Sequence, residues 1–585
     1  MSAQFSASMP NLEQVPRFHR RFPPLVMSLE ELAGTGKHTF PRKKILVREQ
    51  TSDSILHFDA GHPSLDHDPV QMPVSQFWPG CDNSARFLKL SQRRRWKRRT
   101  SVPDATNAHG VSLFSHALAA SSSTAGLQST ECVSSSDSSD NLFSVKSEVK
   151  YSKLFSIEYH DTYKIVNNLS TNNTYALYQC GSTKPDIKNI DAFIPIPVSS
   201  AAAWSTSAAM FIEALGVQDH VKNLGTAPSI VSACLQELLE DVIKPFDEGN
   251  STSTDEQEQS NAVVFSMPGG EDTNTTNTVV STEYLEPSAL GRSEWIKFFA
   301  VFFNAEERAN TAFESIESNY DCFTKKAGEE YDDLRPVVAW TSYAGPTEYN
   351  NNTAYWQISF ADYKYDLVRD AGARMLNTTG AQATMFSTAA AFLDALEEVD
   401  IVIDESFVSY SYDELLKNYG VKDPSKSTYS WVTASRVFRP DRLQSTAGGL
   451  DWFEAPVAFA DALLQDVIGV AHPKFVKDGY QPIWFRNLAD NEPVVVVSAS
   501  NCTDMYAQRK DPAESCSSLT FQEANPDDED YEGVDENQTD DLIYDISKSE
   551  IINESDSDSS DGAFLSVNAL QAAVAVAFVA LCAAM

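Results

Sequence analysis

Along most of this chain, short apolar runs rich in β-branched residues alternate with stretches of helical periodicity, beginning near residue 132. Residues 163–169 and 174–180 have the pattern of paired strands. Residues 192–198 look like a buried strand, with Ser199 and Ser200 supplying the start of the helix that covers 208–216. Alternation of this kind predicts an α/β fold built on parallel sheets.

The longest periodic segment covers residues 293–323. Its aromatic residues recur at helical spacing, with charged residues on the other faces. The segment therefore predicts one unbroken helix of about 30 residues that joins two α/β halves. After it, the pattern predicts strands at 335–343, 400–407 and 431–439 and a helix at 453–473.

The charge of the chain excludes one large class of functions. With 82 acidic and 45 basic residues, the net charge is −37, which repels phosphate backbones and excludes sequence-independent nucleic-acid binding. There is also little support for catalysis, because the sequence contains neither an HExxH motif nor a GxSxG elbow. We expect a chain that is not an enzyme and carries no cofactor.

Six of the eight cysteines lie in the middle of the chain, widely spaced and without a CxxC pair, which favours disulfides over zinc. Cys502 and Cys516 bracket a polar loop and are predicted to pair with each other. Cys132, Cys180, Cys234 and Cys322 leave three possible connectivities.

Nine N-x-S/T sequons support a glycosylated, extracytoplasmic middle, since all of them follow residue 150. They begin at Asn168, Asn172, Asn250, Asn274, Asn351, Asn377, Asn501, Asn537 and Asn553.

Both ends of the chain differ from the middle. Residues 521–561 hold 16 acidic residues against the single Lys548 and should form an extended, self-repelling stalk. The uncharged end, 569–585, follows a cluster of small residues and a short spacer, an order typical of a GPI-attachment signal with Ser560 as the attachment residue. A short C-terminal membrane helix is the alternative.

Three segments together resemble the class III periplasmic substrate-binding proteins, which capture iron-siderophore, haem or cobalamin chelates. They are IPIPVSSAAAWSTSAAMFIEALGVQDHV, DIVIDESF, and SRVFRPDR followed by AGGLDWFEAPVAFADALLQDVIGVAHPKF. The resemblance covers about residues 130–500 and extends to a narrower group of eukaryotic, secreted, GPI-tailed proteins. It departs from the bacterial pattern in lacking a lipoprotein cysteine and a bacterial signal, and residues 247–280 look like an inserted polar loop.

The resemblance implies two Rossmann-like α/β lobes joined by one long helix, with a disordered N-terminal and an acidic C-terminal extension. The expected divisions are a basic extension at 1–128, a first lobe at 129–290, a connecting helix at 291–328, a second lobe at 329–520, the acidic stalk at 521–561 and the anchor signal at 562–585.

The candidate ligand residues lie where strands are expected to end at a cleft between the lobes. Tryptophan side chains would stack on a flat ligand, and hydroxyl and carboxylate groups would contact its polar rim. N-terminal capping and core packing are the alternative roles for the same residues. The candidates are Trp204, Ser205, Thr206, Trp340, Ser342, Tyr343, Glu405, Asp451, Trp452 and Glu454.

The sequence thus predicts a monomeric protein of the extracellular face of the plasma membrane that captures a small molecule, such as an iron or cobalt chelate. The membrane partner would be reached through the GPI anchor or a C-terminal helix. A structural or interaction protein of the cell surface, built on the same scaffold without a ligand, is the alternative.

Overall fold

The computed structural model describes residues 132–133, 141–247, 250–268, 276–331, 335–347, 350–376, 383–407, 411–476 and 479–522. The predicted N-terminal extension, nearly all of the acidic stalk and the anchor signal with Ser560 lie outside these residues. Within the described ranges, no helix combines the length and the apolar character needed to cross a membrane.

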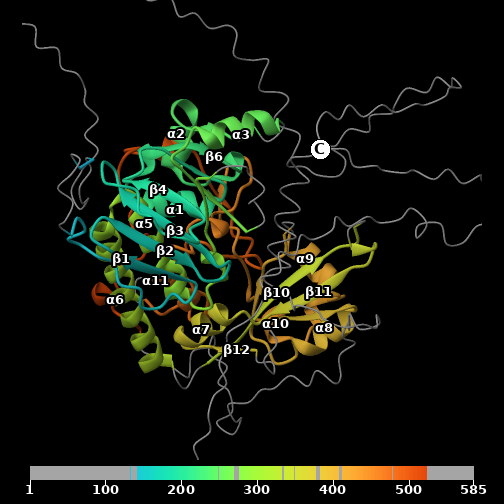
Figure 1. Ribbon diagram of the computed structural model, residues 1–585. Helices are drawn as coiled ribbons and strands as arrows, with labels where there is room; N and C mark the ends of the chain where they lie inside the picture. The colour runs from blue at the N-terminus through green and yellow to red at the C-terminus, as the bar shows by residue number, and fades with distance from the viewer. Residues whose placement is uncertain are drawn as a thin grey trace, which may run out of the picture. The chain divides into compact units, whose positions relative to one another are not determined.

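The first lobe is built on a fully parallel sheet in the order β7-β6-β5-β8-β9, of which Figure 1 labels β6. Its buried strands are nearly continuous apolar runs, as expected of a parallel sheet covered on both faces. The elements are β5 (Ala201–Ala203), β6 (Val221–Leu224), β7 (Lys244–Pro245), β8 (Val263–Ser266), β9 (Thr278–Val280), α1 (Thr206–Ala214), α2 (Ala233–Asp241) and α3 (Ser251–Gln259).

A smaller sheet precedes this lobe and consists of β1 (Phe155–Tyr159), β2 (Tyr163–Asn168), β3 (Asn173–Gln179) and β4 (Ala192–Ile196). The predicted pairing of 163–169 with 174–180 is confirmed by β2 and β3. The predicted helix start at Ser199 and Ser200 is wrong, because β4 joins the small sheet and β5 follows before the helix. Ser205 is the residue that caps α1.

The second lobe is built on a mixed sheet in the order β13-β11-β10-β14-β15-β17, with β12 also paired to β10. β10, β14 and β15 are parallel neighbours, and antiparallel strands flank them. Its strands are β10 (Val337–Ala344), β11 (Tyr355–Ser359), β12 (Arg374–Met375), β13 (Ala383–Phe386), β14 (Ile401–Asp404), β15 (Val437–Arg439) and β17 (Arg486–Asn487).

The helices of this half are α7 (Asp362–Asp370), α8 (Ala389–Ala395), α9 (Tyr412–Tyr419), α10 (Ser430–Thr433) and α11 (Ala460–Ala471). The predicted strand at 431–439 is wrong in its first part, which forms α10, and only its end forms β15. A ribbon of β16 (Leu443–Ser445) and β18 (Val495–Val497) completes the described elements of this half.

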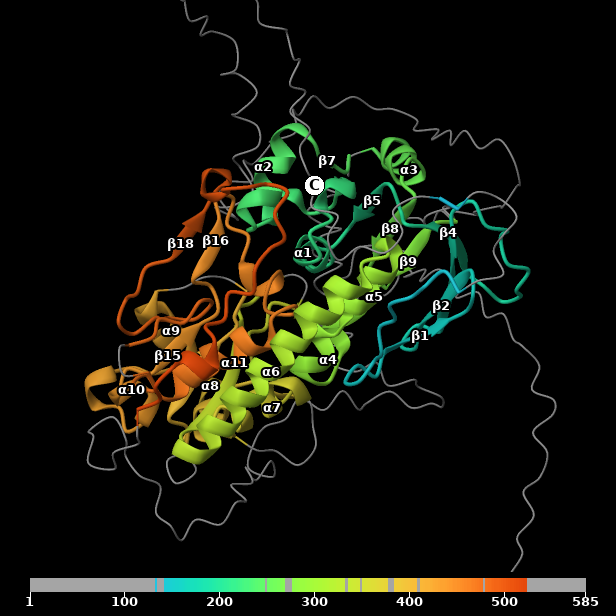
Figure 2. The same cartoon turned by 90° about the vertical axis from the view of Figure 1, so that its left-hand side faces the viewer.

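The predicted single helix at 293–323 is wrong. The segment forms α4 (Ala289–Ser293), α5 (Trp295–Phe303) and α6 (Glu306–Tyr331), which Figure 2 labels. α5 and α6 lie side by side, since the Lys297 ammonium of α5 is 4.3 Å above the Phe313 ring of α6. Glu294 divides α4 from α5 and keeps helical backbone angles. The break between α5 and α6 lies at Asn304, whose φ of 54° is left-handed, a conformation that asparagine tolerates better than most residues. Its side chain bonds to Gln179 and Lys164, and both partners come from the small sheet.

Three disulfides form, and they join Cys132 to Cys180, Cys234 to Cys502 and Cys322 to Cys516. The predicted pairing of Cys502 with Cys516 is therefore wrong. Each of these two cysteines reaches instead to an element far back in the chain, at separations of 268 and 194 residues. Cys502 is held at α2 and Cys516 at α6.

The sequons do not share one environment. Asn172, Asn250, Asn351 and Asn501 are exposed, whereas Asn168 is fully buried. The remaining four, Asn274, Asn377, Asn537 and Asn553, lie outside the described residues.

We expect glycosylation of Asn172 but not of Asn168 in the folded protein. The amide nitrogen of Asn168, the atom that would carry a glycan, donates a hydrogen bond to the carbonyl of Val280 inside the protein. Glycopeptide mass spectrometry of the secreted chain tests this expectation. A glycan at Asn168 in folded protein would contradict the buried position of that side chain.

Candidate functional site

The candidate site begins at the carboxyl end of β5, in the middle of the first sheet. Trp204 follows this strand, stacks on Phe246 with ring centroids 4.2 Å apart and donates a hydrogen bond to Glu258. Gly225 permits this position, because a Cβ there would lie 2.6 Å from the Trp204 ring. Trp204 is therefore committed to a packing cluster of the first lobe.

The two residues after Trp204 have different roles. The Ser205 side chain accepts a hydrogen bond from the Ala208 amide and caps α1, which is the alternative role considered for it. The Thr206 hydroxyl donates a hydrogen bond of 3.2 Å to the carbonyl of Phe453. Thr206 thus connects the end of β5 to the turn that carries Trp452.

In the second sheet, β10 and β14 place their candidate residues side by side. Thr341 pairs in register with Asp404, and the Glu405 amide donates to the carbonyl of Thr341. Tyr343 is held by a hydrogen bond from its amide to the Ser406 hydroxyl, and Ser342 pairs with Gln357 of β11. The carboxyl ends of two parallel neighbours therefore form one edge, where open α/β sheets bind ligands.

Glu405 forms an ion pair with Lys364 of α7 at this edge. The Lys364 ammonium also lies 3.3 Å from the Ser359 hydroxyl and 4.9 Å above the Trp340 ring. The lysine side chain is 7% exposed and that of Glu405 is 19% exposed, so the carboxylate is the more accessible partner. A buried cation seated on an indole face beside an accessible carboxylate can bind a polar group of either sign.

Trp340 differs from the expectation for a cleft wall, because it is fully buried. Its ring stacks on Trp452 at a centroid distance of 5.9 Å and meets Phe485 edge-on. Its indole nitrogen has no hydrogen-bond partner among the described residues. A buried donor without an acceptor costs roughly 1–3 kcal/mol, so an acceptor that reached this atom would bind favourably.

Trp452 and its neighbours form the 3-10 helix η8 (Asp451–Phe453), which the two preceding glycines bring against the first lobe. Gly448 has a φ of 89°, and a Cβ on Gly449 would lie 2.2 Å from the carbonyl oxygen of Ser229. Any other residue at Gly449 would push the turn away from the first lobe.

Asp451 and Glu454, expected at the polar rim of a ligand, are engaged by the protein instead. The Asp451 carboxylate accepts from the Trp484 indole, and Glu454 accepts from the amides of Val231 and Ser232, each at 2.8 Å. Both carboxylates are buried. They hold the η8 turn in place on both sides of Trp452.

The structure brings the three predicted tryptophans together only in part. Trp340 and Trp452 stack, whereas Trp204 packs in a separate cluster with Ala202, Phe246 and Val264. The contact of Thr206 with Phe453 nevertheless joins the end of β5 to the Trp340–Trp452 pair.

Three residues of this junction were not predicted from the sequence. Lys364 looked like an ordinary charged position of a helix, and Arg509 lies in a polar segment without periodicity. Phe453, whose side chain is 60% exposed, follows Trp452 directly and could have been found as a second aromatic of the same loop. For the other two, no local signal distinguishes them from surface charges.

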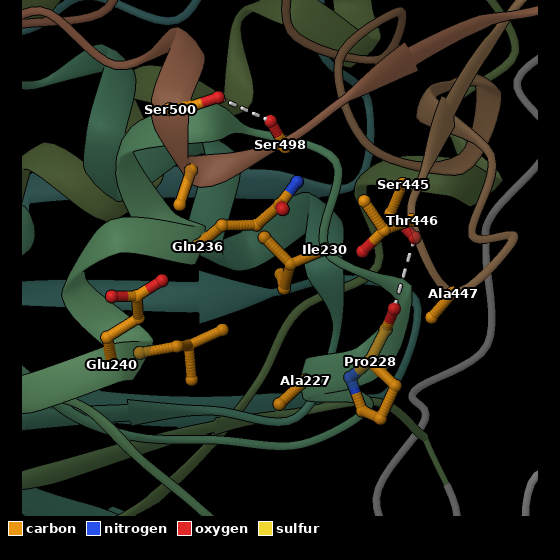
Figure 3. Close-up of a pocket in the computed structure, with 12 residues that line it drawn as sticks. Ala227, Pro228, Ile230, Gln236, Glu240, Ser445, Thr446, Ala447, Ser498 and Ser500 are labelled. Atoms are coloured by element: carbon orange, nitrogen blue, oxygen red, sulfur yellow. Dashed lines mark hydrogen bonds between the residues drawn. The ribbon is translucent and has the colours of Figure 1, made fainter. Parts of the chain in front are cut away.

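A hollow of about 400 Å³ lies elsewhere, between the segment that precedes α2 and the turn after β16 (Figure 3). Its lining is polar in part, and the Ser445 hydroxyl donates to the carbonyl of Pro228 across it. Ser498 and Ser500 close one side. None of the predicted ligand residues lines this hollow. Among the described residues, no group of three or more metal-ligating side chains is found.

Comparison with known proteins gives partial matches, and no family model matches the chain. An uncharacterized lipoprotein of Methanocaldococcus jannaschii is 26% identical over 205 residues, which are 34% of this chain and 43% of that protein. An uncharacterized protein of the same organism is 21% identical over 201 residues, 34% of this chain and 54% of its own length. The chain therefore spans about half the length of the curated relatives it matches.

Several solved structures of solute-binding proteins align with the chain at low identity. A possible iron-binding periplasmic protein from Staphylococcus epidermidis aligns with a TM-score of 0.35 and 13% identity, over 47% of this chain and 99% of its own. A periplasmic haem-binding protein from Pseudomonas aeruginosa aligns with a TM-score of 0.34 and 12% identity, over 49% and 97%. An Fe³⁺-hydroxamate transport protein from Saccharomonospora viridis aligns with a TM-score of 0.34 and 13% identity, over 47% and 93%.

Proposed function

We propose that this chain is a solute-binding protein that holds a small ligand where its two α/β lobes meet. The supporting observation is the continuous connection from one sheet to the other. The end of β5 reaches Phe453 through Thr206, and the neighbouring Trp452 stacks on Trp340 of β10. Ligands of open α/β sheets bind at the carboxyl ends of strands, and here two sheets contribute such ends to one junction.

The chemistry of the junction suits a ligand with a flat apolar part and a polar rim. Phe453 offers an exposed aromatic face, and the Lys364–Glu405 pair, whose lysine lies above the Trp340 ring, offers a cation and a carboxylate. The buried indole N–H of Trp340 offers a donor. We propose a metal chelate, such as one of iron or cobalt, as the ligand, held without a catalytic step.

The proposed location is the outer face of the plasma membrane, where the chain would act as a monomer. Three disulfides and four exposed sequons are consistent with an oxidising, glycosylating compartment. Anchoring would use the C-terminal signal, with Ser560 as the attachment residue.

A second candidate function is a structural or interaction protein of the cell surface that uses the same scaffold without a ligand. One observation favours it: Trp340 and Trp452 pack against each other, and Asp451 and Glu454 are engaged by protein partners. Binding of a small ligand to the purified chain would support the first function, and its absence would support the second.

Binding of a chelate should depend on Phe453. We expect isothermal titration with haemin, a ferric hydroxamate and cobalamin to detect one of the three, and Phe453→Ala to weaken that binding by about 1–3 kcal/mol, the range for a lost aromatic anchor. Leu169→Ala is the matched control, because Leu169 is similarly exposed but lies at the end of β2. Equal affinity in wild type and Phe453→Ala would place the ligand elsewhere.

A further inference from the structure

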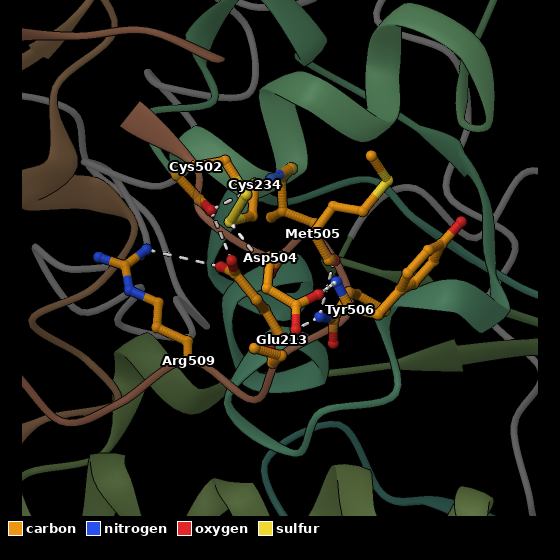
Figure 4. The surroundings of a disulfide bond; sticks show 11 residues. Glu213, Cys234, Cys502, Asp504, Met505, Tyr506 and Arg509 are labelled. Carbon is orange, nitrogen blue, oxygen red and sulfur yellow. Dashed lines mark hydrogen bonds and ion pairs between the residues drawn. A yellow bond between two sulfur atoms is a disulfide. The ribbon is translucent and has the colours of Figure 1, made fainter. Parts of the chain in front are cut away.

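A segment near the C-terminal end of the described residues crosses both lobes and is fixed at its two ends. We call residues 502–516 the strap. Cys502 is bonded to Cys234 of α2, and Cys516 to Cys322 of α6 (Figure 4 shows the first of these disulfides). The two disulfides therefore tie the strap to α2 at one end and to α6 at the other.

The strap lies along the first lobe through hydrogen bonds to its backbone. The Gln218 side chain donates to the carbonyls of Met505 and Ala507, and the Gln508 side chain donates to the carbonyl of Ala214. The Arg509 amide donates to the carbonyl of Glu213. These contacts bring the Arg509 side chain between α1 and the η8 turn.

The Arg509 guanidinium faces three carboxylates, one from α1 and two from the η8 turn. It lies 3.6 Å from Glu213 of α1, 3.7 Å from Asp451 of η8 and 3.6 Å from Glu454, which follows η8. These distances are those of ion pairs and exceed a normal hydrogen bond. The arginine side chain is only 22% exposed, and each of the three carboxylates is 4% exposed or less.

We infer that the strap is a clamp in which Arg509 fixes the η8 turn against the first lobe and so positions Trp452 and Phe453. Asp451 and Glu454 flank these two aromatic residues, and Glu454 in turn binds the Val231 and Ser232 amides of the first lobe. Arg509 is thus a positioning residue for the proposed ligand wall. Its effect on ligand binding rests on the proposed function, whereas the clamp does not.

The balance of charge makes the clamp sensitive to pH. One cation faces three buried carboxylates, so full ionisation would leave two negative charges uncompensated inside the protein. Burial, followed by the charge of Asp451, raises the pKa of Glu454 to about 8, and burial also raises the pKa of Glu213. The neutral donors that face the three carboxylates are the Ser232 hydroxyl on Glu213, the Trp484 indole on Asp451, and the Val231 and Ser232 amides on Glu454.

A second carboxyl pair lies farther along the strap and titrates in the same direction. Asp511 hydrogen-bonds to Asp461 of α11, which also accepts from Asn319 of α6. Burial, followed by the charge of Asp511, raises the pKa of Asp461 to about 8. Two carboxyl groups in contact must share a proton, so the contact between Asp461 and Asp511 also forms only when one of them is protonated.

The sign of the pH effect follows from proton linkage. In the closed clamp Glu454 keeps its proton up to about pH 8, whereas in an opened clamp its pKa returns toward the usual 4.5. The free energy by which protonation of Glu454 favours the closed clamp is therefore complete below about pH 4.5, and it is lost as pH rises through about 8. The opening equilibrium should increase by up to about tenfold per pH unit for one such proton.

Hydrogen–deuterium exchange of the full chain, corrected for intrinsic rates, tests the clamp at the Val231 and Ser232 amides. Arg509→Gln should lower their protection by about tenfold or more, because it leaves the carboxylates of η8 without their cation. Lys510→Gln is the matched control, since Lys510 is the exposed neighbour of Arg509 and should leave protection unchanged. Equal protection in the two variants would overturn the inference.

The pH profile provides a second readout that a purely structural role would not change. In wild type, protection of these two amides should fall as pH rises from about 4.5 to about 8 and change little above that. Asp451→Asn removes the neighbouring charge that helps to raise the pKa of Glu454 and keeps an oxygen to accept from the Trp484 indole, so the fall in protection should end at a lower pH. An unaltered profile would overturn the inference even if Arg509→Gln failed to fold. If Arg509→Gln lowers protection but no chelate binds wild type, the clamp stands and the proposed function fails.

Discussion

Replacement of Arg439 by alanine should lower the free energy of unfolding by about 3–5 kcal/mol, the cost of leaving a buried charge without its partner. Arg439 ends β15 and is 2% exposed. Its guanidinium forms an ion pair with Asp404, bonds to Asp441 at 3.1 Å and donates to the carbonyl of Ser406 at 2.8 Å. Without it, Asp404 would keep the uncharged donors of Ser406 and Tyr419 but no cation.

Loss of the Arg439–Asp404 ion pair should also disturb the candidate site, because Asp404 ends β14 and Glu405 follows it directly. Urea denaturation of wild type and Arg439→Ala measures the effect. Lys426→Ala is the control, since Lys426 pairs with Asp423 at the surface and should change stability by no more than about 0.5 kcal/mol. A loss below about 1 kcal/mol for Arg439→Ala would mean that Asp404 finds other partners or takes up a proton at little cost.

Trp340→Ala should destabilise the protein by about 3–5 kcal/mol, because it removes the largest kind of side chain from a fully buried position. Trp452→Ala should cost less, since Trp452 is only half-buried although it packs on both Trp340 and Phe485. Thermal unfolding of the two variants under the same conditions shows which substitution lowers the unfolding midpoint more. Equal midpoints for Trp340→Ala and wild type would contradict the core role of Trp340.

Local sequence patterns were sufficient for elements whose cause is local. β2 and β3 follow from their apolar alternation, and Gly216 ends the α1 region with a φ of 67°, as a helix-ending glycine should. The position of Glu405 directly after β14 followed from the same rule, whereas Trp340 lies in the middle of β10 and not at its end. The pattern could not predict that Trp340 is buried, because its indole is covered by Trp452 and Phe485, which lie more than a hundred residues away in sequence.

The errors share one physical origin, which is that partners distant in sequence decided the outcome. The helix break at Asn304 depends on Gln179 and Lys164, and neither can be inferred from the apolar periodicity of the segment. The short loop between Cys502 and Cys516 favoured their pairing on entropic grounds, but the strap contacts hold them apart, at α2 and α6. Arg509 was missed for the same reason, since only the folded strap brings it to Glu213, Asp451 and Glu454.

Native mass spectrometry of the folded, secreted chain is the most direct test of the proposal that the junction of the two lobes holds a small ligand. We expect a small molecule to copurify in a 1:1 complex, and Phe453→Ala to release it at collision energies that wild type withstands. Leu169→Ala should retain it. A chain that copurifies with no small molecule and binds none of the three chelates in titration would contradict the proposed function and favour a scaffold that serves at the cell surface without a ligand.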